Sequence, residues 1–371
     1  MIVKRFWKRT FCAIALAVAG VPAASSAGNP DPRPTLILVR GAGGEAAFEQ
    51  AFTAEASRWR EGAAKGNLKL VEIGADGVVE QTGESKPAEL PAAATDRARL
   101  EQAIAAERGA TSAELWLVLL GHGTFDGRTA RFNLRGPDVS PEELAGWLTG
   151  VERPLAIINC ASASGPFLPV LSGPNRVVIT ATRSGAEHNY ARFGDHLSRA
   201  IADSAADLDK DGQTSLLEAF LVASRGVADF YGQANRLATE HPLLDDNGDR
   251  LGTPPEWFRG VRATKAPASG QQVDGRRAHQ WRLVPSDVDR HLPPELRKDR
   301  DDLELAIFTL RDRQAELPED AFFQQLEVLA LKMAELDERA EAAAKAASAQ
   351  PTESTSAPSA TPSPAQPSGA N

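Results

Sequence analysis

The sequence predicts an α/β fold, because apolar segments alternate with longer segments in which apolar residues recur at helical spacing. Three of the apolar segments lack the in-out alternation of a half-exposed strand, which is typical of central strands in a parallel sheet covered on both faces. We therefore predict a three-layer α/β/α sandwich with a mostly parallel sheet. The predicted strands cover residues 35–39, 68–73, 115–120, 155–158 and 176–180.

Helices are predicted between these strands. Apolar residues at helical spacing include Phe52, Ala56 and Trp59 after the first strand, and Leu100 and Ile104 before the third. A further helix is expected to begin after residue 140, where a serine, a proline and a glutamate occupy the positions of an N-cap, a first helical residue and a capping box. The helices would cover the sheet.

Composition excludes several classes of protein. Of the 371 residues, 42% are hydrophobic and 25% are charged, which argues against a wholly disordered, collagen-like or polytopic membrane protein. The formal net charge of -9 argues against a nucleic-acid-binding protein with a basic surface. With two cysteines, no disulfide scaffold is expected.

The N-terminal segment has the pattern of an export signal. Basic residues within 4–9 precede an apolar run over 11–21, and small residues follow at 23–27. We predict a signal peptide over 1–27 that is cleaved. A retained membrane anchor is less favoured, because the run is shorter than the roughly 20 residues that span a bilayer. The protein would then be secreted or periplasmic, without membrane contact after signal removal, and Cys160 would be its single thiol.

Three segments follow the sandwich, which is expected to occupy residues 35–260. Residues 261–300 are polar and contain proline and glycine, so we expect an irregular arm or linker. Two stretches of helical periodicity over 301–347 predict a helical hairpin, a candidate surface for a protein partner. Residues 348–371 are rich in Pro, Ser, Thr and Ala and are predicted to be disordered.

Two chemically reactive residues follow consecutive predicted strands. His122 lies between two glycines after the third strand, and Cys160 follows the fourth. Consecutive parallel strands tend to be neighbours, and ligands bind beyond the carboxyl ends of strands in open α/β sheets. Because an imidazole can take a thiol proton and then protonate a leaving amine, we predict His122 and Cys160 as a catalytic dyad. A turn histidine bonded to backbone and an inert buried cysteine remain the alternatives for each residue alone.

This pattern resembles the caspase-hemoglobinase superfamily of cysteine peptidases, nearest to its legumain-like branch. The resemblance extends over about residues 35–260 and implies a caspase-like sandwich with His122 and Cys160 as the dyad. It also implies that the N–H groups of Gly123 and Cys160 form the oxyanion hole. The residues that flank the cysteine, Asn159 and Ala161, depart from the legumain pattern and leave the substrate class open.

Two arginines are candidates for substrate binding. Arg40 ends the first apolar segment and Arg183 follows the fifth, places that resemble the specificity positions of that superfamily. An arginine there could bind an acidic side chain bidentately. The alternative is a solvated arginine at a strand end.

Residues 207–218 match the calcium loop of an EF-hand. Oxygen-bearing side chains occupy the first, third, fifth, ninth and twelfth positions, and glycine occupies the sixth. The alternative is an acidic turn between two helices. A second acidic run, 245–249, has Arg250 where the glycine belongs, so an Asx-rich turn is favoured there over a looser calcium site. The expected Ca²⁺ ligands are Asp207, Asp209, Asp211, Gln213 through its carbonyl, Ser215 and Glu218.

Two hypotheses follow. The first is an exported cysteine endopeptidase that hydrolyses a peptide or protein substrate through a thioacyl intermediate and carries a calcium-binding loop. The second is a catalytically inactive, caspase-like calcium-binding protein that docks onto a partner. Geometry separates the two, because a thiol beyond the reach of His122, or buried under packed side chains, favours the second.

Overall fold

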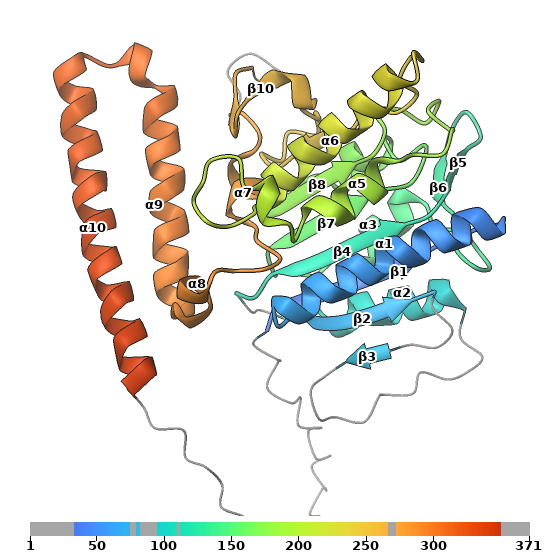
Figure 1. Ribbon diagram of the computed structural model, residues 1–371, viewed down its shortest axis with the longest axis horizontal. Helices are drawn as coiled ribbons and strands as arrows, with labels where there is room; N and C mark the ends of the chain where they lie inside the picture. Colours follow the sequence, from blue (N-terminus) through green and yellow to red (C-terminus); the bar gives the residue numbers. More distant parts are fainter. Residues whose placement is uncertain (1–32, 75–78, 82–94, 110–111, 266–271, 350–371) are drawn as a thin grey trace, which may run out of the picture. The chain divides into compact units, whose positions relative to one another are not determined.

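The computed structural model describes residues 33–74, 79–81, 95–109, 112–265 and 272–349 (Figure 1). The predicted signal peptide, residues 1–27, lies outside the described residues, as does the predicted tail from residue 350 onward. In the part of the chain that is described, no helix is both long enough and apolar enough to cross a bilayer.

A seven-stranded sheet forms the centre of the described structure, in the order β3-β2-β1-β4-β7-β8-β9. The five inner strands pair in parallel, whereas β3 and β9 pair antiparallel at the two edges. Neither edge strand was predicted from the sequence. The strands are β1 (Thr35–Arg40), β2 (Lys69–Ile73), β3 (Val79–Gln81), β4 (Leu115–Leu120), β7 (Leu155–Asn159), β8 (Arg176–Thr180) and β9 (Leu243–Asp245).

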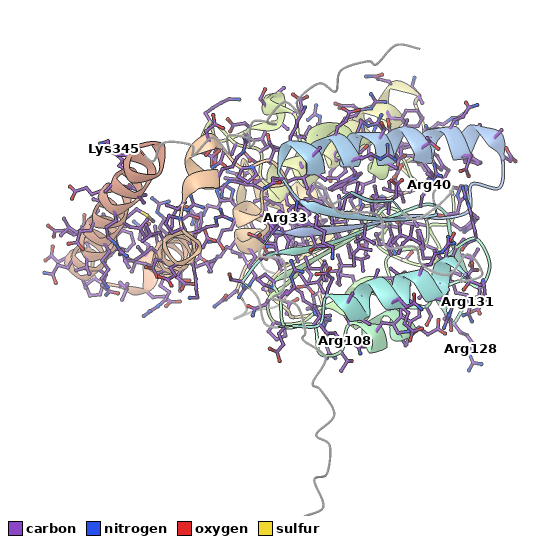
Figure 2. The ribbon with its side chains drawn as sticks, turned by 90° about the horizontal axis from the view of Figure 1, so that it is seen from below. Arg33, Arg40, Arg108, Arg128, Arg131 and Lys345 are labelled. Atoms are coloured by element: carbon purple, nitrogen blue, oxygen red, sulfur yellow. The ribbon has the colours of Figure 1, made fainter. Side chains whose placement is uncertain are left out.

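Helices cover both faces of this sheet, which confirms the predicted α/β sandwich with a mostly parallel sheet. One core contains Trp116 and Val118 of β4 together with side chains of the helices α1, α5 and α6. The other contains Leu117 and Leu119 of the same strand together with α2, α3 and α4. Figure 2 shows α1 and α2 on opposite sides of the sheet. The helices are α1 (Ala46–Lys65), α2 (Asp96–Ala106), α3 (Pro141–Trp147), α4 (Phe167–Leu171), α5 (Phe193–Ala200) and α6 (Leu216–Gln233).

Hydrogen-bonding side chains fix where two of these helices begin. Ser140 caps α3 in a capping box with Glu143, and Pro141 occupies the first turn, as predicted. Ser215 caps α6 in a second capping box, with Glu218. The start of α6 is therefore fixed by two residues of the predicted calcium loop. Short elements complete the sandwich: β5 (Gly123–Phe125), β6 (Ala130–Phe132), η1 (Ser204–Ala206), η2 (Pro255–Trp257), β10 (Phe258–Arg259) and β11 (Arg262–Ala263).

The segment expected to be an irregular arm differs from that expectation. Ala278, Trp281 and Leu283 are buried in the same core as α1, α5 and α6, and the Trp281 ring lies 4.9 Å from that of Trp116, centroid to centroid. These isolated apolar residues stand among polar ones, so no periodicity marked them. The core of the sandwich therefore extends to Leu283. The helices of this segment are α7 (Arg276–Gln280) and α8 (Asp287–His291).

The predicted helical hairpin is present as α9 and α10, which lie side by side (Figure 1). Here α9 spans Pro294–Asp312 and begins earlier than expected, because its first turns are charged and show no apolar spacing. A short turn, η3 (Gln314–Glu316), leads to α10 (Glu319–Ala349), which continues two residues into the predicted tail.

Candidate functional site

The carboxyl ends of β4 and β7 bring His122 and Cys160 to the same edge of the sheet. Leu119 of β4 pairs in register with Asn159 of β7, and the Cys160 N–H donates to the Leu119 carbonyl at 2.9 Å. Both side chains lie on the face covered by α1, since His122 contacts Phe52 and Cys160 belongs to the core that contains α1. The predicted adjacency of the two strand ends is therefore confirmed.

His122 is half-buried among aromatic rings. Its ring centroid lies 4.7 Å from that of Phe48, 5.1 Å from that of Phe52 and 6.1 Å from that of Tyr190. Burial lowers the pKa of His122, opposed by a hydrogen bond to the Gly43 backbone and by the charge of Glu45. The imidazole is thus bound to backbone, as in the alternative considered for a turn histidine.

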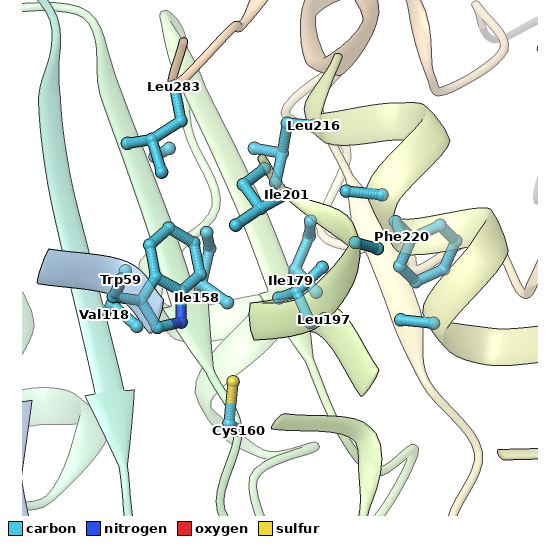
Figure 3. Close-up of a cluster of buried hydrophobic side chains, with 14 of the residues drawn as sticks. Trp59, Val118, Ile158, Cys160, Ile179, Leu197, Ile201, Leu216, Phe220 and Leu283 are labelled. Carbon is cyan, nitrogen blue, oxygen red and sulfur yellow. The ribbon is translucent and has the colours of Figure 1, made fainter. Parts of the chain in front are cut away.

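The Cys160 thiol is buried, with 3% of the residue exposed. Figure 3 shows its sulfur pointing back into the cluster that contains Trp59 and Leu197. Helix α5 lies directly on it, because a Cβ added at Gly194 would come within 2.9 Å of the Cys160 Cβ. No hydrogen bond joins the Cys160 sulfur to His122 in the described part of the chain.

The electrostatic surroundings of Cys160 oppose ionisation. Burial raises the pKa of its thiol well above the ordinary value, and the carboxylates of Glu55 and Glu240 raise it further. A reactive thiolate needs the reverse, a neighbouring positive charge or a helix N-terminus that lowers the thiol pKa. These surroundings favour the protonated thiol, and α5 covers it.

The two N–H groups predicted to form an oxyanion hole are already hydrogen-bonded. The Gly123 N–H donates to the Ser162 hydroxyl at 3.2 Å, and that hydroxyl donates back to the Gly123 carbonyl at 3.1 Å. The Cys160 N–H is used by the sheet, as described above. A Cβ at Gly123 would lie 2.1 Å from the Ser162 carbonyl oxygen, so the glycine allows the backbone at Ser162 to approach closely. The oxyanion-hole assignment does not fit this geometry.

The two arginines expected to bind substrate have different surroundings. Arg40 is buried, and its guanidinium donates to the Gly74 carbonyl at 3.0 Å and to the Thr53 hydroxyl at 2.7 Å. Arg40 therefore links the carboxyl end of β1 to that of β2. Arg183 is exposed and forms an ion pair with Glu187 at 3.2 Å. The structure does not bring these two arginines together.

Glu55 is a buried acidic residue near the thiol that the sequence analysis missed. It lies on α1 and its pKa is raised to about 8, chiefly by burial and by the charge of Asp195, against a hydrogen bond from Tyr190. A Cβ at Gly194 would approach both Glu55 Oε2, at 2.7 Å, and Cys160. One signal was available: Glu55 lies between Phe52 and Trp59, within the apolar stripe of its helix.

The predicted calcium loop brings three carboxylates together. One oxygen from each of Asp207, Asp209 and Asp211 lies within 4.8 Å of the others, a group that could hold a metal ion. The Asp207 carboxylate accepts the N–H groups of Lys210 at 2.7 Å and Gly212 at 3.1 Å. Gly212 has a φ of +88°, the left-handed conformation that favours glycine. All three donors are oxygens, the type that hard divalent cations such as Ca²⁺ prefer.

The remaining predicted ligands surround this group. Glu218 accepts the Leu208 N–H at 2.7 Å through one carboxylate oxygen and the Ser215 N–H at 2.8 Å through the other. The Gln213 side chain accepts the N–H of Ser286 at 2.8 Å. The helix α5, which precedes the loop, ends at Ala200 and is followed by η1.

An imidazole and a guanidinium of the α7 region contact the loop and were not found from the sequence. Asp209 lies 3.4 Å from His279, and Asp211 lies 3.0 Å from Arg282. The guanidinium of Arg282 brings positive charge to the Asp211 carboxylate. No local pattern marks them, since about 70 residues separate each pair in the chain.

Neither the family models nor the curated proteins compared with this sequence match it. The functional assignment therefore depends on the geometry of the two sites.

Proposed function

We propose that the protein is an exported calcium-binding protein with a caspase-like sandwich, which docks onto a protein partner and does not use Cys160 as a nucleophile. The observation that carries this proposal is the burial of the thiol, with 3% of Cys160 exposed and its sulfur directed into the core. Of the two hypotheses from the sequence, a covered thiol favours the second.

The electrostatics support the same choice. Glu55 and Glu240 raise the pKa of the Cys160 thiol, and the imidazole of His122 bonds to the Gly43 backbone. A peptide carbonyl would need free donors near the sulfur, whereas the Gly123 N–H is bonded to Ser162. Hydrolysis at Cys160 would require α5 to move away and the thiol pKa to fall.

The donor set of the loop 207–218 supports calcium binding. Three carboxylates lie together, and the loop already has its turn at Gly212 and its exit helix α6 capped by Ser215. Calcium, when bound, supplies the positive charge that lets these carboxylates lie together. Asp207, Asp209 and Asp211 would hold it, with Glu218 and the Gln213 carbonyl as further donors.

The helical hairpin supports partner docking. Three large apolar side chains of α10 are more than half exposed, namely Phe323 at 54%, Val328 at 52% and Leu331 at 58%. Val328 also lines an open groove of about 530 Å³ between α9 and α10. Large apolar side chains exposed beside an open groove are features of interaction sites.

Labelling with a peptidyl electrophile tests the assignment of Cys160. We expect the native protein to be labelled no faster than Cys160→Ala, and the native thiol to react only after denaturation, because α5 covers the sulfur. The proposal that the hairpin surface is free of contacts within the chain is tested with Phe323→Ser. Because Phe323 is 54% exposed, this substitution should leave the free energy of unfolding nearly unchanged. Rapid labelling of the native protein that is lost in both Cys160→Ala and His122→Ala would overturn the proposal.

A cysteine endopeptidase is the second candidate, favoured by one observation. The ends of β4 and β7 place His122 and Cys160 at one edge and on one face of the sheet, where a dyad is required. In this case α5 would have to open on activation. Cleavage of a peptide library that disappears in Cys160→Ser would establish it.

A further inference from the structure

Arg282 lies between the calcium loop and the base of the helical hairpin. We define the hairpin root as residues 287–304, that is, α8 and the first turns of α9. We propose that Arg282 couples the two regions by exchanging Asp211 of the loop for the acidic side chains of the root when calcium binds. This inference rests on the proposed binding of calcium to the loop.

Two nitrogens of the Arg282 guanidinium have different surroundings. Its side chain is 7% exposed, and Nη2 donates to Asp211 Oδ2 at 3.0 Å. Its Nε is buried and has no hydrogen-bond partner among the described residues. A buried guanidinium is costly without a partner, so we expect Arg282 to leave Asp211 for another carboxylate within its reach.

Such carboxylates lie in the root. Asp289 of α8 is held by Arg300 of α9 at 2.5 Å, and the positive charge of Arg282 helps to lower the pKa of Asp289. The charge of Arg282 also acts on Asp301 of α9. Arg282 is therefore near enough to both to interact with them while it is bonded to the loop.

Gln213 provides a second link between the same two regions. Its side chain accepts the Ser286 N–H at the start of α8 and also hydrogen-bonds to Asp289. Its own carbonyl is the expected calcium ligand at the seventh loop position. A cation bound by the Gln213 carbonyl would therefore also restrict the Gln213 side chain, which hydrogen-bonds to the root.

The direction of the exchange follows from charge. A divalent cation shared by Asp207, Asp209 and Asp211 would repel the buried guanidinium of Arg282 and weaken its attraction to Asp211. The neighbouring Trp281 and Leu283 are buried in the core, so the backbone stays in place and only the side chain changes partner. The root then gains a positive charge among its carboxylates and becomes better ordered.

Coupling of this kind is reciprocal. If calcium strengthens the root through Arg282, then the charge of Arg282 must also affect calcium affinity. Removing that charge should tighten calcium binding, because the cation no longer competes with the guanidinium for Asp211. It should also remove the effect of calcium on the root.

Hydrogen exchange followed by mass spectrometry tests the inference on the full chain. We expect calcium to slow amide exchange in residues 287–304 of the native protein by about 5-fold or more, within the usual range of such couplings. Arg282→Gln should lose this protection and bind calcium tighter by a similar factor, measured by titration calorimetry. The matched control is Arg277→Gln, since Arg277 bonds to Asn175 instead of the loop. It should behave as the native protein.

Asp211→Asn gives an independent check that does not remove a buried group, because the Asp211 side chain is partly exposed. It frees Arg282 from the loop, so the root should be protected without calcium. Equal protection by calcium in the native protein and in Arg282→Gln would overturn the inference, as would normal calcium binding with no change in the root. Absence of calcium binding to the native protein would overturn the proposed function as well.

Discussion

The loops 207–218 and 245–256 share one backbone design. In each loop, the side chain of the first residue accepts the N–H groups of the fourth and sixth residues. The side chain of the third residue accepts the N–H of the fifth, and the side chain of the fifth accepts the N–H of the seventh. The fourth and sixth residues have positive φ in both loops: +66° at Lys210 and +88° at Gly212, against +80° at Gly248 and +70° at Arg250.

The two loops differ in what surrounds their carboxylates. In the second loop Asp245 and Asp246 are buried, and Asp246 accepts the N–H groups of Gly275 and Ala278 at the start of α7. Asp209 and Asp211 of the first loop are exposed and lie beside His279 and Arg282, respectively. The hydrogen-bond pattern thus fixes a turn, whereas the surroundings decide whether its acidic groups hold the fold together or remain available to an ion.

Removing a second-loop carboxylate should have the largest effect. Asp246→Ala leaves the buried N–H groups of Gly275 and Ala278 without acceptors, so we expect the free energy of unfolding to fall by about 3 kcal/mol or more. Asp211→Ala in the first loop should cost less than about 1 kcal/mol without calcium, because its ion pair is partly exposed. Urea denaturation measures both, and equal losses would contradict the comparison.

Calcium should distinguish the loops next. At a free concentration of about 100 times Kd, calcium should stabilise the native protein by about 3 kcal/mol. Asp207→Asn should lose most of this gain, because Asp207 is the first ligand of the loop. Asp249→Asn, at the fifth position of the second loop, should keep it. Thermal unfolding with calcium and with chelator gives the result, and loss of the gain in Asp249→Asn would make the two loops alike.

The pH dependence of stability should follow the second loop. Asp274 accepts the N–H groups of Asp246 and Asn247 of the second loop. Burial raises the pKa of Asp246, and burial together with the charge of Asp246 raises the pKa of Asp274 to about 8. Since the folded state then holds protons that the unfolded state releases, these two groups contribute stability that is fully present below the ordinary carboxyl pKa of ~4 and is lost as pH rises through the raised values. Asp274→Asn should reduce the loss of stability between acid and neutral pH by about 1.4 kcal/mol for each unit by which the pKa of Asp274 is raised. Denaturant titrations from acid to neutral pH measure it, with Asp211→Asn as the variant that should keep the native slope.

Substitutions at the sixth position of each loop should have the smallest effect on stability. Arg250→Gly should stabilise the protein by about 0.5–1 kcal/mol, because a left-handed φ of +70° is strained for arginine and free for glycine. Gly212→Ala should destabilise it by a similar amount, since no atom lies within 4 Å of the added Cβ and only the backbone conformation opposes it. If both changes destabilise the protein, the sixth positions are not equivalent.

Much of the fold could be predicted because it depends on local patterns. Long apolar segments became the inner strands, and Ser140 with Glu143 began α3 as expected. The edge strands β3 and β9 have three residues each, too few for a pattern. Trp281 and Leu283 were missed because their burial depends on contacts with residues far away in the sequence.

The candidate site was predictable in its location and not in its chemistry. The order of the strands brought His122 and Cys160 to one edge, which follows from sequence order alone. The direction of the Cys160 side chain follows that of Ile158 two residues earlier, and both faces of β7 are buried, so the sequence gives no alternation from which to infer it. The covering of the thiol by α5 and the neighbouring Glu55 arises only in the folded chain.

The burial of Trp281 and Leu283 has a consequence for how the chain can fold during synthesis. The sheet is complete in sequence at β9, yet its α1-side core still lacks these two side chains, and Trp116 has no Trp281 to pack against. A chain released at residue 260 would expose that surface to solvent and to chaperones. The shortest autonomously folding fragment must therefore extend beyond Leu283, and the sandwich can close only after that residue has left the ribosome.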